Sequence, residues 1–504
     1  MSKALGITLR GIEAVAVEVE VEVTGGLFAI SIVGLPDAAV REAKERVRAA
    51  LRSIGISLRG RIAVNLAPAD LPKEGALLDL PIAIEMAKQV GSVPASSQPA
   101  VFVGELALDG RLRRAKGAVP AAMLARKLSL PLYIPHENAH EVSLVKGVEA
   151  YAISHIAELI EALRGEVALR PIEHRVPAPQ EIEVDVDLAD IKGQAGAKRA
   201  MEIAAAGHHN LLMVGPPGSG KTMLARALKG ILPPLSDEEL LEVLLIYSAR
   251  GLSFDGGRAR PFRSVHHTAS TVAVCGGGNA LQPGEISLAH RGVLFLDEFT
   301  EFRRDLIEAM RQPLEDGKIV VSRSSGSVTY PAQVLLALAC NPCPCGNFGD
   351  PGFPCRCSPG ELERYQRKLS GPILDRIDMQ ISVPRLSPDE LMAVEPSGEG
   401  SASVRRRVER AREIQIERWK AWGIRSNAEV PEALLRKEAH IKKEARAFLR
   451  SAMGRSRLSG RGFTRILRVA RSVADLAGEE CVGASHVAEA LAYREGANIY
   501  GRPS

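Results

Sequence analysis

Eight residues from Gly215 to Thr222 have the composition of a phosphate-binding loop. They read GPPGSGKT and fit G-x-x-x-x-G-K-[ST] at every fixed position. Glycines let backbone amides turn toward an anion, Lys221 is expected to reach the β- and γ-phosphates of a nucleoside triphosphate, and Thr222 Oγ1 is expected to bind Mg²⁺. The alternative is a glycine-rich turn that matches by chance. The predicted ATP-binding residues are Gly215, Pro216, Pro217, Gly218, Ser219, Gly220, Lys221 and Thr222.

Two later positions add the groups that hydrolysis needs. Asp297 and Glu298 follow the apolar run 293–296, and Asn341 follows the apolar run 335–340. Asp297 is expected to hold Mg²⁺ through water, and Glu298 to orient or deprotonate the attacking water. Asn341 is expected to position that water between the γ-phosphate and Glu298. The alternatives are a strand that merely ends in acidic residues and a turn-forming asparagine.

Two arginines are candidates for contacts with the transferring phosphoryl group. Arg376, within GPILDRID at 371–378, stands where an arginine finger is expected, although an arginine beside two aspartates also suits a surface ion pair. Arg461 opens a C-terminal helix and is predicted to be the second sensor residue, with Arg465 as the second choice.

The cysteines suggest a metal site. Cys343, Cys345, Cys355 and Cys357 form CxC-x9-CxC, and four thiolates close in sequence suit a structural Zn²⁺ site. Four reduced surface thiols are the alternative. The total of seven cysteines is odd and argues against a disulfide framework, so the cytoplasm is the expected compartment.

Two segments are candidates for contacting DNA phosphates without reading sequence. One is an insert at about 251–283, and the other is a β-hairpin at 317–328. A solvated basic hairpin is the alternative for the second. The predicted DNA-binding residues are Lys318, Arg323, Arg263, His266 and His267.

These groups need a scaffold, and the hydrophobic pattern describes one. The apolar runs 210–214, 293–296 and 335–340 predict buried parallel strands of an α/β sheet. Within the N-terminal part, 15–23 alternates apolar and acidic residues as a half-buried strand does, and 28–34 is expected to pair with it across Gly25-Gly26. The predicted domains are 1–165, a linker at 166–188, an ATPase core at 189–390 and a helical lid at 391–504.

Composition narrows the function classes. The chain has 504 residues and a net charge of +5, which is compatible with nucleic-acid binding without proving it. No apolar run is long enough for a membrane span, and the N-terminus has no secretory signal.

The order of these motifs resembles an AAA+ ATPase of the branch that holds magnesium chelatase and the MCM helicases. The runs 260–268, 283–290 and 365–378 are similar to the ComM/YifB family in particular. The N-terminal part, through 104–111 and 134–138, resembles the proteolytic domain of Lon, of ribosomal S5-like α+β fold. Leu77 and Ala121 stand at the positions of the protease's serine and lysine, so no peptidase activity is expected.

The resemblance implies a fold class and a function. The expected fold is α/β, with a Lon-like α+β domain, an AAA+ P-loop core and a C-terminal helical lid. Members of the family are expected to be hexameric, ATP- and Mg²⁺-dependent DNA helicases that act on single-stranded or branched DNA and promote branch migration during recombination in natural transformation. A magnesium-chelatase-like motor for metal insertion and an ATP-switched regulatory protein are the alternatives.

Overall fold

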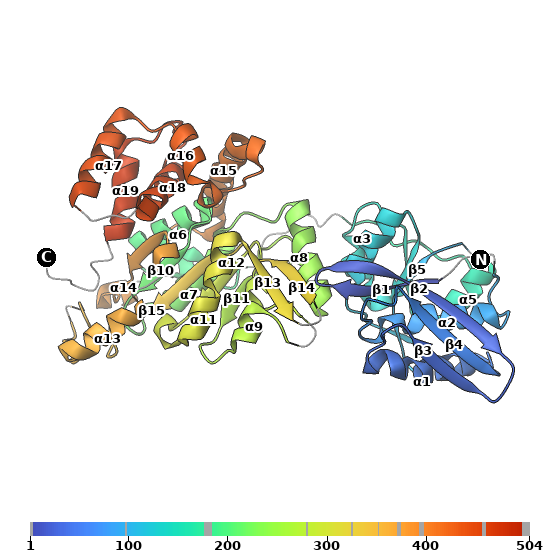
Figure 1. Cartoon of the computed structure of the whole chain (residues 1–504). Helices are drawn as coiled ribbons and strands as arrows, with labels where there is room; N and C mark the ends of the chain where they lie inside the picture. The colour runs from blue at the N-terminus through green and yellow to red at the C-terminus, as the bar shows by residue number, and fades with distance from the viewer. Residues whose placement is uncertain are drawn as a thin grey trace. The chain divides into compact units, whose positions relative to one another are not determined.

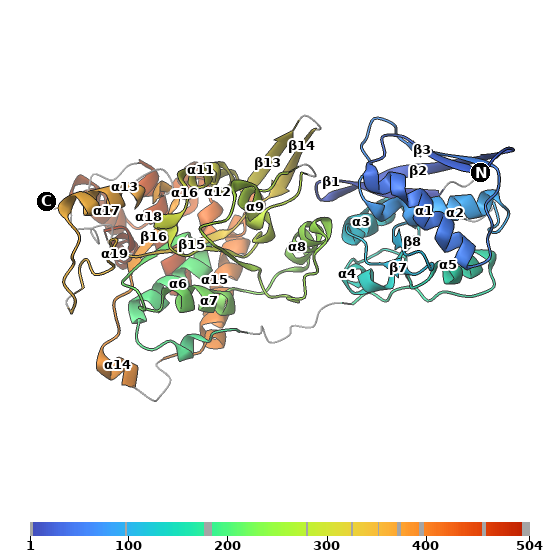
Figure 2. The same cartoon turned by 90° about the horizontal axis from the view of Figure 1, so that it is seen from below.

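The computed structural model forms two compact units, which are described separately (Figures 1 and 2). The first unit comprises Met1–Gln180, Asp237–Gly257 and Ser322–Tyr330, and the second comprises Glu181–Ser236, Arg258–Val321 and Pro331–Ser504. The residues that the structure describes are 4–95, 98–175, 184–278, 281–323, 326–350, 352–369, 374–392, 398–455 and 460–495.

The first unit is built on a seven-stranded mixed sheet in the order β3-β4-β2-β1-β5-β8-β9. The predicted alternation is confirmed in β2, where Val17, Val19 and Val21 are buried and Glu18 is exposed. Its strands are β1 (Ala4–Arg10), β2 (Glu13–Thr24), β3 (Ala29–Val33), β4 (Arg61–Ala67), β5 (Val101–Phe102), β8 (Leu132–Pro135) and β9 (Ala150–Ile153). The main helices of this unit are α1 (Ala38–Ser53), α2 (Asp79–Gln89), α3 (Ala118–Leu128), α5 (Ile156–Arg164) and α8 (Asp237–Arg250).

The expected hairpin between β2 and β3 is wrong. Strand β3 pairs with β4 in parallel, and β4 pairs with β2 in antiparallel fashion, so β4 lies between the two. Parallel neighbours need a crossover, and α1 supplies it with Val40, Val47 and Leu51 buried. The alternating pattern predicts which face of a strand is buried, but it does not identify the neighbouring strand.

The two positions that the resemblance to Lon assigns to a catalytic serine and lysine are apolar and buried. Leu77 lies in the short 3₁₀ helix η1 (Ala76–Leu78), and Ala121 lies in α3. Neither side chain can act as a nucleophile or a base.

The second unit contains a five-stranded parallel sheet in the order β11-β12-β15-β10-β16. Every residue of β10, β12 and β15 is buried, as the continuous apolar runs predict. The strands are β10 (Leu211–Val214), β11 (Phe262–Val265), β12 (Val293–Leu296), β15 (Leu335–Cys340) and β16 (Met379–Ser382).

The segment expected to form one insert at 251–283 requires a correction. Residues Phe262–Val265 form β11, the edge strand of the sheet, paired with β12. Sequence patterns miss this strand because only Val265 of its four residues is buried. Its described continuation holds the short helices α9 (Thr271–Cys275) and α10 (Glu285–Leu288).

The C-terminal helices share one apolar core with the sheet and with α6 (Ala195–Gly207). Figure 1 shows α15 and α18 beside α6. The helices are α15 (Ser401–Trp419), α16 (Glu432–Glu438), α17 (Lys443–Arg455), α18 (Gly460–Leu476) and α19 (Ala484–Glu495). The predicted hairpin forms from β13 (Lys318–Arg323) and β14 (Gly326–Pro331). Among the described residues, no helix has both the length and the apolar character that crossing a bilayer requires.

Candidate nucleotide site and arginine pocket

The phosphate loop joins β10 to α7 (Lys221–Ile231), as predicted. Gly218 and Gly220 have φ values of 76° and 91°, which favour glycine. A Cβ atom at Gly215 would collide with the carbonyl oxygen of Val383, so this position also requires glycine. The glycines are therefore needed for the path of the loop itself.

Lys221 connects the phosphate loop to Asn341, the residue predicted to position the attacking water. Its Nζ donates hydrogen bonds to the carbonyl oxygens of Gly215 (2.7 Å) and Pro216 (2.9 Å) and to Asn341 Oδ1 (3.3 Å). Burial lowers the pKa of Lys221, and the positive charge of Arg385 acts in the same direction. The structure thus brings together the lysine at the start of α7 and the asparagine at the end of β15.

The two predicted Mg²⁺ ligands are in direct contact. Thr222 Oγ1 donates a hydrogen bond to Asp297 Oδ2 at 2.7 Å. The hydroxyl comes from the first turn of α7 and the carboxylate from the end of β12. Hydroxyl and carboxylate oxygens at this separation, next to a phosphate loop, fit the ligand preference of Mg²⁺.

Glu298 has a constrained backbone and a histidine neighbour. Its φ of 51° lies in the left-handed region, which is uncommon for a residue with a side chain and is often found at functional sites. His267 Nδ1 lies 3.6 Å from Glu298 Oε2, and the His266 ring lies next to that of His267, tilted by 34° with centroids 4.2 Å apart. Sequence analysis grouped these histidines with the DNA contacts, whereas the structure places His267 where it can orient the predicted base.

Tyr365 is a site residue that sequence reasoning missed. It lies on α13 (Pro359–Leu369), is buried, and donates a hydrogen bond to the carbonyl oxygen of Asn341 at 3.0 Å. The hydroxyl of Thr300 donates to the Tyr365 hydroxyl at 3.0 Å. Tyr365 therefore joins the segments that follow β12 and β15. The one aromatic residue in the sequence of α13, PGELERYQRKL, was the available signal.

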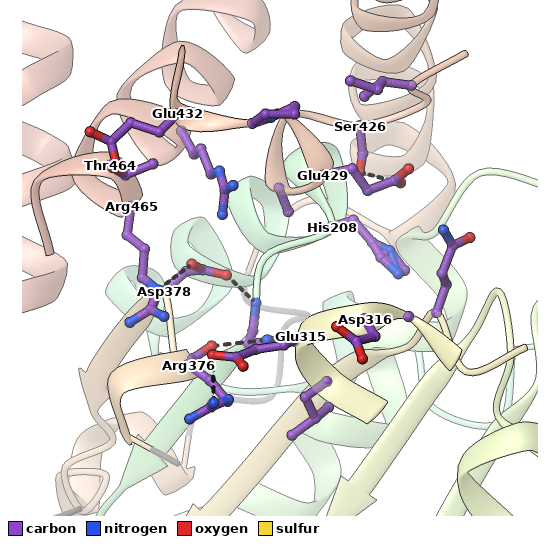
Figure 3. Close-up of a pocket in the computed structure, with 18 of the residues that line it drawn as sticks. His208, Glu315, Asp316, Arg376, Asp378, Ser426, Glu429, Glu432, Thr464 and Arg465 are labelled. Carbon is purple, nitrogen blue, oxygen red and sulfur yellow. Dashed lines mark hydrogen bonds and ion pairs between the residues drawn. The ribbon is translucent and has the colours of Figure 1, made fainter. Parts of the chain in front are cut away.

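The predicted arginines lie elsewhere, around a cavity of about 880 Å³ in the second unit (Figure 3). Its lining includes residues that directly precede the strands β10, β15 and β16: Asn210, Val334 and Asp378. The cavity is therefore at the amino ends of β10 and β15, whose carboxyl ends carry the phosphate loop and Asn341; Asp297 follows β12, the parallel neighbour of β15. Four arginines line this arginine pocket: Arg376, Arg461, Arg465 and Arg468.

Two of the pocket arginines are positioned by acidic partners. Arg376 forms an ion pair with Glu315 at 2.5 Å, and Arg465 Nε lies 3.5 Å from Asp378 Oδ1 (Figure 3). Asp378 also accepts a hydrogen bond from the backbone amide of Asn210 at 2.9 Å. Burial acts to raise the pKa of Asp378, but His209, Arg465 and this amide together hold it below its ordinary value. Asp378 is thus a fixed negative charge.

A buried polar network connects this pocket to the C-terminal helices. His209 lies 3.8 Å from Asp378 and hydrogen-bonds to Ser472 of α18 at 2.8 Å. Asn427 donates to Ser472 at 3.0 Å and to Asp475 at 2.8 Å. The helices are therefore joined to the arginine pocket by directional bonds in addition to apolar packing.

The four predicted metal-binding cysteines form one cluster. Their Sγ atoms all lie within 4.8 Å of one another, and three of the separations are 3.3, 3.6 and 3.7 Å. Tetrahedral Zn²⁺ with Zn–S bonds of about 2.3 Å requires Sγ atoms about 3.8 Å apart, so the cluster fits this ion. Backbone amides of Arg356 and Asn347 lower the pKa of Cys345 to about 6, which favours the metal-binding thiolate.

The predicted DNA-binding residues have different surroundings. Arg263 makes two hydrogen bonds to Glu285, at 2.6 and 2.9 Å, and His266 is bonded to Thr268 at 2.8 Å. Lys318 is exposed on β13. The side chain of Arg323 lies outside the described residues.

The parallel sheet, the phosphate loop and the acidic and amide groups at its carboxyl edge define an AAA+ ATPase of the magnesium-chelatase type. The family model described as magnesium chelatase, subunit ChlI, matches residues 187–391, and the one described as subunit ChlI of Mg-chelatase matches residues 19–138. The model described as magnesium chelatase, subunit ChlI C-terminal, matches residues 398–494. Comparison with individual proteins narrows this class: the chain belongs to the ComM/YifB family.

Three relatives show the extent of the similarity. The competence protein ComM of Haemophilus influenzae is 43% identical over 96% of this chain and 95% of its own length. YifB of Escherichia coli is 41% identical over 96% of this chain and 95% of its own length. The magnesium-chelatase 38 kDa subunit of Cereibacter sphaeroides is 25% identical over 30% of this chain and 51% of its own length.

Proposed function

We propose that the protein is an ATP-driven motor that forms a hexameric ring on single-stranded or branched DNA and promotes branch migration during recombination, as in natural transformation. The observation that carries the proposal is the division of the ATPase groups between opposite ends of the same strands. Strand β10 has four residues, and at about 3.3 Å per residue it separates the two ends by about 13 Å. An arginine in the pocket is therefore suited to a neighbouring subunit's nucleotide.

Hydrolysis then uses groups of two subunits. One subunit binds the triphosphate through its phosphate loop and Lys221, and Thr222 and Asp297 hold the Mg²⁺ that neutralises phosphate charge. Glu298 orients the attacking water together with Asn341. The neighbour contributes Arg376 and Arg461, which offset the charge that develops on the phosphoryl group.

DNA contact is proposed for the β13–β14 hairpin. Lys318 offers an exposed cation, and Arg323 remains a prediction from sequence. In a ring these few charges are repeated by symmetry around a shared channel, which supports binding by a chain whose net charge is only +5. The name of the Haemophilus influenzae relative, competence protein ComM, also supports a role in DNA uptake or recombination.

The test compares ATP hydrolysis alone, with branched DNA, with single strands and with a porphyrin plus Mg²⁺. We expect DNA to stimulate hydrolysis severalfold and the porphyrin to have no effect. ATP hydrolysis should drive branch migration of a four-way junction with homologous arms until it dissociates into two duplexes. Glu298→Gln should abolish this dissociation. Stimulation by porphyrin alone would favour a chelatase motor, and no response to any of them would favour a regulatory protein.

We also propose that the cysteine cluster binds Zn²⁺. Protein purified without chelators should contain about one Zn²⁺ per chain, because the four thiols have the separations of a tetrahedral site. The double variant Cys343→Ser/Cys355→Ser should lose the metal, whereas Cys481→Ser, which changes a thiol outside the cluster, should keep it. Elemental analysis that finds no metal in the unmodified protein would refute the site.

A further inference from the structure

The residues between the two cysteine pairs position an arginine from another part of the chain. We call Cys343–Cys357 the cysteine loop; of its residues, 351 is not described. Arg385 Nε donates to Asp350 Oδ2 at 2.7 Å, and its Nη2 donates to Asn347 Oδ1 at 3.3 Å. Its guanidinium carbon lies 4.7 Å from the centre of the Phe353 ring. Three side chains of one loop therefore fix the direction of this cation.

Arg385 belongs to the same edge of the sheet as the phosphate loop. It follows β16, whose neighbour β10 leads directly into that loop. Together with Gly215 and Pro216 it lines a cavity of about 370 Å³. Gln194 fixes the adjoining backbone by donating to the carbonyl oxygens of Pro384 (2.7 Å) and Ser219 (3.4 Å). Arg385 is thus held beside the loop that is built to bind phosphate.

The cysteine loop also touches the phosphate loop directly. Gly346 packs against Pro217 so closely that a Cβ atom would lie 2.5 Å from Pro217 Cδ. The cysteine loop begins at Cys343, two positions after Asn341, which is predicted to position the attacking water. The cysteine loop therefore contacts the phosphate loop, begins next to Asn341 in the chain and orients Arg385.

We propose that Arg385 is a further ATP-binding residue, held toward the triphosphate by the cysteine loop, and that metal binding by the four cysteines keeps it there. This inference rests on the proposed ATPase and zinc site. A guanidinium group has five N–H donors; two serve Asp350 and Asn347, and the others, which bond to none of the described residues, can donate to phosphate oxygens. Metal–thiolate bonds restrict the conformations of the cysteine loop before ATP binds. The loss of conformational entropy on ATP binding is therefore smaller.

The test measures the Kd of a fluorescent ATP analogue, with Mg²⁺, on the full chain. Arg385→Ala should raise this Kd about tenfold or more, the range of one charge-assisted hydrogen bond. Cys355→Ser should raise it by a similar factor. The double variant should be no weaker than the weaker single variant, because the metal acts through Arg385. Arg446→Ala, an exposed arginine on α17, and Cys481→Ser are the matched controls and should not change it.

The variants distinguish failure of the ATP site, of the role of Arg385 and of the link through the metal. If Arg385→Ala binds the analogue as tightly as the unmodified chain while Lys221→Ala does not bind it, the ATP site stands and the role of Arg385 is refuted. If Cys355→Ser loses its metal without weakening binding, or the two effects multiply in the double variant, the link through the metal is refuted. Metal content should stay at about one Zn²⁺ in Arg385→Ala, and thermal melting should show that each variant is folded.

Discussion

Glu298→Gln is expected to bind ATP normally and to hydrolyse it about 10²–10⁴-fold more slowly. The amide preserves the shape of the side chain but cannot accept a proton or orient water as a carboxylate does. Because Lys221, Thr222 and Asp297 are unchanged, the phosphate and Mg²⁺ contacts remain. Equilibrium binding of a fluorescent nucleotide and single-turnover hydrolysis measure the two effects separately.

Lys221→Ala is the matched control for this variant, because it should lose nucleotide binding itself. Its amine is held among the carbonyl oxygens of the loop and Asn341, so its removal leaves the centre of the loop without a positive charge. Normal turnover by Glu298→Gln would show that another group activates the water.

Arg376→Ala is expected to lower ATP turnover about 10³–10⁵-fold while each subunit still binds ATP. Mixing it with Lys221→Ala should restore part of the activity, although each variant is inactive alone. Some interfaces of the mixed ring pair an intact phosphate loop with an intact Arg376. The measurement is ATPase activity against the mixing ratio, with co-assembly verified by differently tagged subunits.

The same mixing experiment shows whether Arg376 acts on a neighbouring subunit's nucleotide or on the nucleotide of its own chain. If Arg376 served its own chain, no mixture would exceed the activity of its parts. Co-assembled subunits that recover nothing would therefore refute action between subunits. Arg304→Ala is a useful control, since Arg304 is exposed on α11 (Arg304–Ala309) and forms a local ion pair with Glu308 at 3.0 Å.

Local sequence predicted much of the carboxyl edge of the sheet. Strands β10, β12 and β15 are continuous apolar runs; β10 leads directly into the phosphate loop, and β12 and β15 are followed at once by Asp297 and Asn341. Edge strand β11 was missed because most of its residues are not buried, and the pairing of β3 was wrong because periodicity does not choose a partner.

The residues that sequence reasoning missed depend on distant contacts. Arg385 follows a proline in no recognisable motif, and its partners Asn347 and Asp350 lie 38 and 35 positions away. The sequence predicted roles for Arg376 and Arg461 but not the cavity that they share, because they lie 85 positions apart and the C-terminal helices must fold back onto α6. Such positions follow from the tertiary fold.

The placement of the arginine pocket and the phosphate loop at opposite ends of β10 has a consequence for assays at low protein concentration. If a complete site needs two chains, the rate per chain is set by mass action and falls once dilution separates them. A plot of ATPase rate against protein concentration should then curve upward before it becomes linear. DNA that holds several subunits together should shift this curve to lower protein concentration. Part of the stimulation of ATP hydrolysis by DNA should therefore vanish at high protein concentration.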